Sequence, residues 1–154
     1  MSSAHAPSSR HPIRIWSDGS CAPNPGPGGW GAIVERGSER RELFGNHPAS
    51  TNNIMELTAA IEALRTTPPG AHVILTTDSL YVKDGITRWI TAWKRKGWRK
   101  SDGKPVLNQD YWRALDELAQ QRHVSWEWVR GHDGHPENER CDELANQARE
   151  ALRR

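Results

Sequence analysis

The segment Val73–Thr77, VILTT, restricts the folds open to this chain more than any other stretch. Nearly all of its residues are apolar or β-branched, which is typical of a strand that is buried on both faces. Such a strand lies inside a sheet that has helices packed on it. A length of 154 residues is enough for one domain with a single core. We therefore expect an α/β fold.

Three further strands precede this one, at Ile13–Ser17, Trp30–Glu35 and Arg41–Gly45. The links between them are short and contain proline, glycine or the turn sequence RGSER, so we expect antiparallel neighbours. The next stretch, STNNIMELTAAIEALR, begins with N-capping residues, spaces its apolar residues at helical intervals and ends at TPPG. This helix is the crossover that allows Val73–Thr77 to run parallel to the first strand.

The second half of the chain has the pattern of helices around one more strand. Helical patterns begin at about Leu80 and Thr87, and another covers 109–122 with Asn108 as its N-cap. The stretch VSWEWV alternates as a fifth strand, and a last helix begins at about Glu137. The expected architecture is a five-stranded mixed sheet flanked by helices.

The composition of the chain indicates the cellular compartment of the protein more clearly than it indicates the partners. The first twelve residues lack the apolar centre of a signal peptide, so we expect a disordered tail at 1–12 and a domain at 13–154. No apolar run approaches the ~20 residues that cross a bilayer. Two cysteines, Cys21 and Cys141, are compatible with a reducing compartment, although the sequence leaves a disulfide open. We expect a cytoplasmic protein; its net charge of +2 indicates no class of partner.

Two strands of this plan run into an aspartate. Asp18 follows the first strand and Asp78 follows VILTT, so parallel pairing brings both acids to one carboxyl edge, where open α/β sheets place their sites. Glu56 lies in the first turns of the crossover helix, and Asp142 follows Cys141 on the inward stripe of the last helix. A single acid is usually solvated or caps a helix, so the hypothesis of a site depends on all four acids and the topology together.

Four carboxylates at one point repel one another unless a cation is present. Oxygen ligands of this kind suit Mg²⁺, which keeps water ligands for chemistry. A pair of such ions can stabilise the attacking and leaving oxygens of a phosphoryl displacement. The sequence therefore predicts a magnesium site and a phosphoryl-transfer reaction at this edge.

The chain resembles bacterial ribonuclease HI over about residues 13–148, in SDGSCAPNPGPGGWGAI, TNNIMELTAAIEAL, TTDSLYVKDGITRWI, WKRKGWRK and WEWVRGHDGHPENERCDELA. The resemblance implies the ribonuclease H fold and a monomeric endoribonuclease. It would hydrolyse the RNA strand of RNA–DNA hybrids by a two-metal-ion mechanism, leaving 5′-phosphate and 3′-hydroxyl ends. Asp18 would bridge two Mg²⁺ ions, for which Mn²⁺ could substitute, with Glu56 and Asp78 on one ion and Asp142 on the other.

A histidine, His132, lies between two glycines in RGHDGHPEN. A lone loop histidine is most often solvated, but the resemblance implies that His132 is a mobile catalytic residue, and an imidazole suits proton transfer near neutral pH. A zinc site of His132, His135 and Cys141 is an alternative, although the spacing does not fit a common structural pattern. The glycines of NPGPGGWG lack the Lys-Ser/Thr of a P-loop and favour a tight turn.

A basic segment follows the helical pattern at Thr87, with six cations and one acid between Lys94 and Lys104. Tryptophans interleave with the cations, and such a combination favours binding to a phosphate backbone. Burial of Trp89 and Trp93 in the core is the alternative. The resemblance implies a basic protrusion that grips the DNA strand, a phosphate pocket and contacts in the minor groove of the hybrid. The substrate-binding candidates are Asn24, Thr51, Asn52, Asn53, Trp89, Trp93, Lys94, Arg95, Lys96, Trp98 and Asn108.

At two positions the chain departs from the family. Leu80 stands where relatives often carry glutamine, and Leu107 stands where lysine is common, which affects substrate contacts but not the acids. The expected partner is an RNA–DNA hybrid and not a membrane, and contact with a single-stranded-DNA-binding protein is left open. Two other functions are weighed as alternatives: a DNA-directed nuclease of transposase type, and a hybrid-binding module without catalysis.

Overall fold

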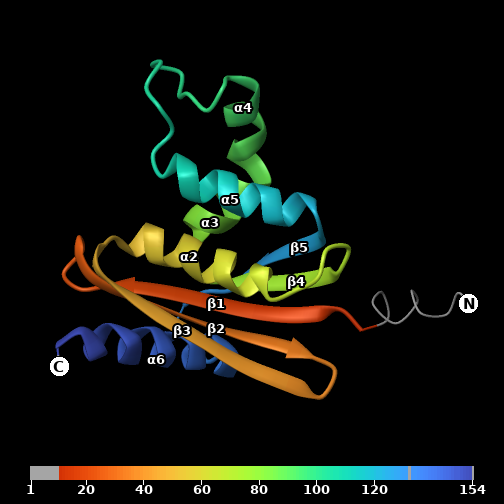
Figure 1. The fold of residues 1–154 in the computed structure, drawn as a ribbon, viewed down its shortest axis with the longest axis vertical. Helices are drawn as coiled ribbons and strands as arrows, with labels where there is room; N and C mark the ends of the chain where they lie inside the picture. Colours follow the sequence, from red (N-terminus) through yellow and green to blue (C-terminus); the bar gives the residue numbers. More distant parts are fainter. Residues whose placement is uncertain (1–10, 132, 154) are drawn as a thin grey trace, which may run out of the picture.

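The computed structural model describes residues 11–131 and 133–153, and its centre is one five-stranded sheet (Figure 1). The strand order is β3-β2-β1-β4-β5. Strands β1, β2 and β3 are antiparallel, whereas β4 and β5 run parallel to β1. The bounds of the strands are Ile13–Cys21 for β1, Gly26–Arg36 for β2, Glu39–Ser50 for β3, His72–Thr77 for β4 and His123–Trp128 for β5.

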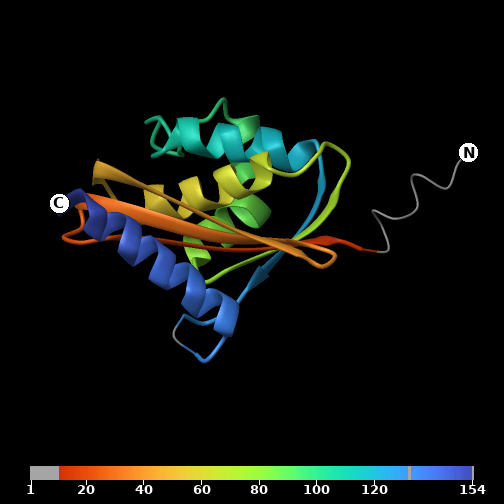
Figure 2. The same ribbon diagram turned by 60° about the horizontal axis from the view of Figure 1, so that its bottom comes forward.

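Helices cover both faces of this sheet. Figure 2 shows α6 on one face and α2 and α5 on the other, while Figure 1 shows α4 and the loop after it extending beyond α5. None of the helices in the described part of the chain is long and apolar enough to cross a membrane. The helices are α2 at Asn52–Arg65, α3 at Leu80–Asp84, the π-helical turn η2 at Gly85–Trp89, α4 at Ile90–Arg95, α5 at Gln109–Gln120, α6 at Pro136–Glu150 and the 3₁₀ turn η3 at Ala151–Arg153.

The order and type of these elements confirm the fold expected from the sequence. The bounds of three strands differ. β2 begins at Gly26, so the glycines expected in a tight turn are paired within the strand, and β3 extends over Glu39–Ser50. The strand β1 does not end at Asp18. Its antiparallel pairing with β2 continues past that residue, where Asp18 lies opposite Gly31, while its parallel pairing with β4 stops at Ser17 and Thr77. Asp18 therefore lies at the end of the parallel ladder but inside the antiparallel one.

The two helical patterns expected from about Leu80 and Thr87 form one nearly continuous helical segment. The π-helical turn η2 separates α3 from α4 within it. A π turn inserts a residue into the helical repeat and shifts the buried face, so a single helical segment gives two patterns in the sequence. The largest fully buried side chain, Trp112 of α5, lies against η2, where a side chain at Gly85 would collide with its ring.

Glycines set how closely the helices approach the sheet. A Cβ atom at Gly19 of β1 would overlap the backbone of Met55 and Glu56 in α2. On the opposite face, a Cβ atom at Gly29 of β2 would overlap the backbone carbonyl of Ala145 in α6, and one at Gly31 would also meet α6. Both helices that carry acids of the expected site are therefore seated directly against the sheet backbone.

Candidate active site

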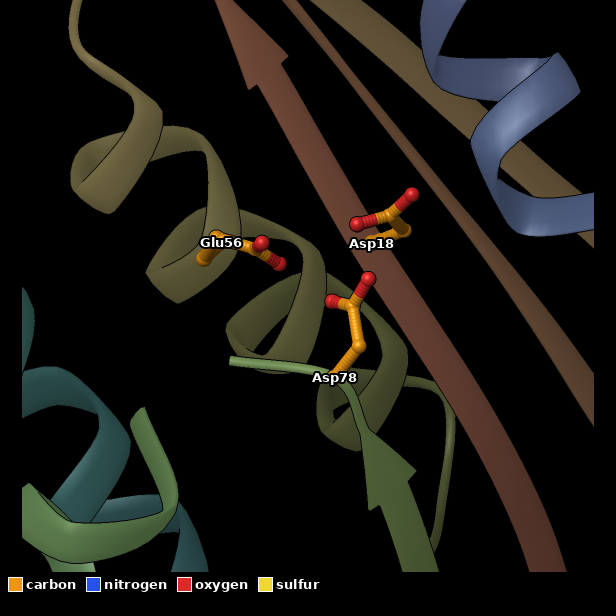
Figure 3. Close-up of side chains that lie close together, drawn as sticks. All are labelled: Asp18, Glu56 and Asp78. Carbon is orange, nitrogen blue, oxygen red and sulfur yellow. The ribbon is translucent and has the colours of Figure 1, made fainter. Parts of the chain in front are cut away.

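Three acids from three different elements meet at one edge of the parallel ladder. Asp18 projects from β1, Asp78 follows the last residue of β4, and Glu56 lies in the second turn of α2 (Figure 3). One carboxylate oxygen from each of them lies within 4.8 Å of the other two. Asp18 is buried, while Glu56 and Asp78 are partly exposed.

The negative charges of the carboxylates in this cluster repel one another. Burial, followed by the charges of Asp78 and Asp142, raises the pKa of Asp18 to about 9. Burial and the charges of Asp18 and Asp78 also raise the pKa of Glu56 well above its ordinary value. Both shifts have the sign expected for carboxylates that are brought together out of water without a cation.

Two oxygens of the cluster have no hydrogen-bond partner among the described residues although they are buried. They are Oε1 of Glu56 and Oδ1 of Asp78. Buried polar atoms are normally satisfied, so these two need a ligand. Hard divalent cations bind carboxylate oxygens, and a cation here would also remove the repulsion that raises the pKa values. The residues therefore fit a divalent metal ion.

The fourth acid of the expected site, Asp142, lies in the second turn of α6 and outside the group of three. It is close enough to Asp18 that its charge raises the pKa of that residue. Its Oδ2 atom accepts a hydrogen bond from Nδ2 of Asn146, one turn later in the helix, at 3.3 Å. The structure thus places Asp142 beside the Asp18 end of the cluster.

The segment after β5 lies directly against Asp78. A Cβ atom at Gly131 would lie 2.8 Å from Oδ2 of Asp78, so a larger residue at this position would displace the carboxylate. The indole N–H of Trp128 donates to the backbone carbonyl of Asp78 at 3.0 Å. His132, the expected catalytic histidine, lies outside the described residues.

Cys141 has no features of a zinc ligand. Its thiol is fully buried and donates to the backbone carbonyl of Trp16 in β1 at 3.3 Å. Burial raises the pKa of this thiol, which favours the protonated form, whereas zinc binds the thiolate. The structure therefore assigns Cys141 to the packing between α6 and β1, and the alternative of a zinc site loses this ligand.

Three of the substrate-binding candidates are joined at the start of α2. Oδ1 of Asn24 accepts from the backbone N–H of Asn52 at 3.1 Å, and Oδ1 of Asn52 accepts from the backbone N–H of Cys21 at 2.6 Å. Thr51 is the N-cap of α2, because its Oγ1 accepts from the N–H of Ile54 at 3.1 Å. Since both asparagine oxygens are occupied, each side chain has its amide N–H groups left for other partners. Asn53 is exposed on the same turn.

Asn108 is held at the start of α5 by a tyrosine. Its backbone is left-handed, with φ of 60°, and its Nδ2 donates to the hydroxyl of Tyr81 at 3.1 Å. The same hydroxyl accepts from the indole N–H of Trp112 at 3.1 Å. These bonds fix the side chain of Asn108 against the core at the N-terminus of a helix.

The basic segment rests on packed tryptophans. Trp93 lies between Trp89 and Trp98, with ring centroids 6.0 and 6.4 Å away. Trp98 is buried and Arg113 covers its ring, whereas Trp89 is 40% exposed. The alternative of core burial therefore holds in part for Trp93 and is wrong for Trp89, which offers the most exposed surface of the three. Trp98, expected to bind substrate, is instead buried in the core, because its ring packs against Trp93 and under Arg113.

The cations of this segment are not equivalent. Lys94 forms an ion pair with the buried carboxylate of Asp116 at 3.0 Å, which directs its charge toward α5. Arg95 and Lys96 are exposed at the end of α4. The two leucines that depart from the family, Leu80 and Leu107, are 51% and 69% exposed.

Comparison with known proteins decides the family. Residues 10–150 match the family described as RNase H. The chain belongs to the ribonuclease H family. This confirms the predicted resemblance, the fold and the class of enzyme, a ribonuclease.

Individual relatives agree with this assignment along almost their whole length. The ribonuclease H of Halorhodospira halophila is 56% identical over 140 residues, which cover 91% of this chain and 94% of the relative. That of Thiobacillus denitrificans is 55% identical over 135 residues, covering 88% and 91%. Among solved structures, LC9-RNase H1, described as a type 1 RNase H with the type 2 active-site motif, superposes with a TM-score of 0.83 at 35% identity, covering 92% of this chain and 73% of the other.

Sequence reasoning missed several residues that shape the site of this ribonuclease H. Gly19 and Gly131 permit close approach to Glu56 and Asp78, and Trp128 holds the backbone of Asp78. The two glycines could have been found in the sequence, since each stands one residue from a predicted catalytic residue. Their role could not be predicted, because the lack of a side chain has a consequence only where the atoms that face the glycine are known.

Proposed function

We propose that the chain hydrolyses the RNA strand of RNA–DNA hybrids with two Mg²⁺ ions, leaving 5′-phosphate and 3′-hydroxyl ends. The observation that carries the proposal is the meeting of Asp18, Glu56 and Asp78 within 4.8 Å, in a member of the ribonuclease H family. Asp18 would hold both ions, with Glu56 and Asp78 on one and Asp142 on the other. When bound, such ions lower the pKa of a coordinated water and stabilise charge on phosphate oxygens.

The chain itself contributes rigidity and proton release. Asp18 and Asp78 each directly follow the last paired residues of the parallel ladder between β1 and β4, and α2 packs closely against β1 at Gly19, next to Glu56, so little reorganisation is needed to form the ligand set. Because Asp18 holds a proton up to about pH 9 in the metal-free protein, binding of the cations must release protons from the cluster. We also propose, on the family resemblance, that His132 moves a proton near the scissile phosphate or assists product release.

We propose that the hybrid lies across the start of α2 and the basic segment. The amide groups of Asn24, Asn52 and Asn53 are short polar groups of the kind that read 2′-hydroxyls in a minor groove. Thr51 and Asn108 stand at the N-termini of two helices, where a phosphate is favoured by the helix dipole and the backbone N–H groups. Trp89 and the exposed cations would meet the DNA strand.

The cations of the basic segment are predicted to contribute unequally to hybrid binding. Replacing Arg95 and Lys96 together with alanine is expected to raise KM and to reduce the salt slope of hybrid affinity by about two, since each phosphate contact contributes about one. Lys94→Ala is expected to change the slope less, because Asp116 already pairs with this lysine. Affinity measured by fluorescence anisotropy at several salt concentrations checks both results. An unchanged slope in the double variant would exclude this segment from binding the backbone.

The proposed activity is tested with end-labelled RNA–DNA hybrid, duplex RNA and duplex DNA, each in Mg²⁺ and in EDTA. We expect cutting of the RNA strand of the hybrid alone, in Mg²⁺ alone. Binding without cutting would favour the silent hybrid-binding module, and cutting of duplex DNA would favour the DNA-directed nuclease. Repeating the assay with Mn²⁺ tests whether it substitutes.

We further propose that the protein acts as a monomer in the cytoplasm. All four acids come from one chain, and both cysteines are buried and unpaired, as suits a reducing compartment. Sedimentation at micromolar concentration tests the monomer, and a shift to the mass of two chains would contradict it.

A further inference from the structure

Asn146 of α6 is the centre of a small polar cluster that ends on Asp142. Its Nδ2 donates to Oδ2 of Asp142 at 3.3 Å. Its Oδ1 accepts from Oγ of Ser20 at 3.3 Å and from Nη1 of Arg149 at 2.8 Å. Nη1 of Arg149 also donates to the hydroxyl of Ser20, which closes a ring of three side chains.

The chemistry of this ring allows one orientation of the Asn146 amide. A guanidinium can only donate, and the serine hydroxyl that accepts from it gives its own proton onward, so the oxygen of Asn146 must face both. The NH₂ group is then directed at Asp142. The three side chains of the ring are partly buried, with Arg149 16% exposed, and the ring joins α6 to β1 only two residues after Asp18.

Asp142 needs such a support more than the other acids do. Asp18, Glu56 and Asp78 form a compact group, whereas Asp142 lies outside it on α6, the helix on the face of the sheet opposite α2. Without a fixed donor, the side chain of Asp142 could take other staggered rotamers that turn its carboxylate away from the cluster. A fixed donor on Oδ2 holds the carboxylate in place and leaves its other oxygen for a ligand.

We propose that Asn146 is a positioning residue for the reaction, which holds Asp142 as a metal ligand through its NH₂ group while Ser20 and Arg149 hold Asn146. This inference rests on the proposed function, because it assumes that Asp142 binds one of the ions. Partners that orient metal ligands typically contribute 10- to 100-fold, by order of magnitude, to metal affinity or activity.

Two substitutions separate positioning from packing. Asn146→Ala removes the donor and the acceptor, and is expected to raise the Mg²⁺ concentration for half-maximal cleavage about tenfold and to weaken Mn²⁺ binding to the substrate-free protein, measured by calorimetry. Asn146→Asp keeps the acceptor for Ser20 and Arg149 but cannot donate to Asp142. The new carboxylate repels Asp142 but gains an ion pair with Arg149, so the melting temperature is expected to stay close to the wild-type value, while kcat falls about tenfold or more.

Gln147→Ala is the matched control, since Gln147 is the next residue of α6 and takes no part in the ring. It is expected to match wild type in metal binding and cleavage. The proposal is overturned if Asn146→Ala equals Gln147→Ala in both metal readouts, or if Asn146→Asp cleaves at the wild-type rate. Asp18→Asn, run in parallel, tests the proposed function separately: if it cleaves normally, the metal site itself is misassigned, whatever Asn146 does.

Discussion

Replacing Asp18 with asparagine is expected to reduce cleavage of an RNA–DNA hybrid by at least about a thousandfold while leaving hybrid binding nearly unchanged. Asparagine has the same shape but no charge, and Asp18 is the one acid proposed to hold both ions. Losing a metal clamp removes several kcal/mol of transition-state stabilisation, and about 4 kcal/mol corresponds to a factor of a thousand. Single-turnover cleavage in Mg²⁺ and anisotropy binding in EDTA measure the two quantities separately.

The same substitution is expected to change the pH dependence of stability. In the folded protein the pKa of Asp18 is raised to about 9 from an ordinary value of 3.8, so between these pH values the folded state holds a proton that the unfolded chain has lost. Its contribution to stability is complete below about pH 4 and is lost as pH rises toward 9. Urea unfolding in EDTA should therefore show stability falling with pH, and Asp18→Asn should reduce that slope by up to about 1.4 kcal/mol per pH unit.

Each result has a clear contrary outcome. Cleavage within tenfold of wild type by Asp18→Asn would remove Asp18 from the metal site. An unchanged pH slope would mean that the carboxylate is ionised in the metal-free fold. A loss of hybrid binding that parallels the loss of cleavage would indicate damage to the fold, which the unfolding curves would reveal.

Gly19→Ala is the second large expected effect, on both stability and activity. The new methyl group would overlap the backbone of Met55 and Glu56, and backbone cannot rotate away as a side chain can. We expect α2 to shift from β1, at a cost of about 1–3 kcal/mol in the free energy of unfolding. Moving Glu56 by about 1 Å from Asp18 is expected to lower the cleavage rate about a hundredfold.

Gly70→Ala is the control for this experiment. Gly70 has φ of 85° and open space around its Cα, so alanine there costs about 1–2 kcal/mol of backbone strain without touching another residue. It lies between α2 and β4, before the strand whose far end carries Asp78. Equal loss of activity in the two variants would show that lower stability, rather than displacement of Glu56, explains Gly19→Ala.

The elements of the fold could be predicted because each has a local signal. The apolar run of β4, the capped and periodic residues of α2 and the alternation of β5 each report which faces are buried. The prediction failed for the end of β1, where pairing with the glycines of β2 carries the strand past Asp18. It also read one helical segment as two, because the π turn at Gly85–Trp89 changes the phase of the pattern.

The acids of the site followed from the same signals. Parallel pairing of β1 and β4 dictates that Asp18 and Asp78 emerge at one edge, and Glu56 follows from the crossover helix between them. The sequence did not show which cations of the basic segment form ion pairs within the protein. Lys94 differs from Arg95 and Lys96 only because α5 brings Asp116 beside it.

The sequence by itself determined which residues are buried, in what order the strands and helices occur, and which acids come to the edge of the sheet. Only the tertiary structure decided the distances between elements, and with them the closeness of the carboxylates and the ring of Ser20, Asn146 and Arg149. The physical reason is that periodicity along one element records which side faces the core. How far apart two elements pack depends on atoms from both elements. At Gly19 and Gly29 the helix approaches the strand closely because glycine has no side chain.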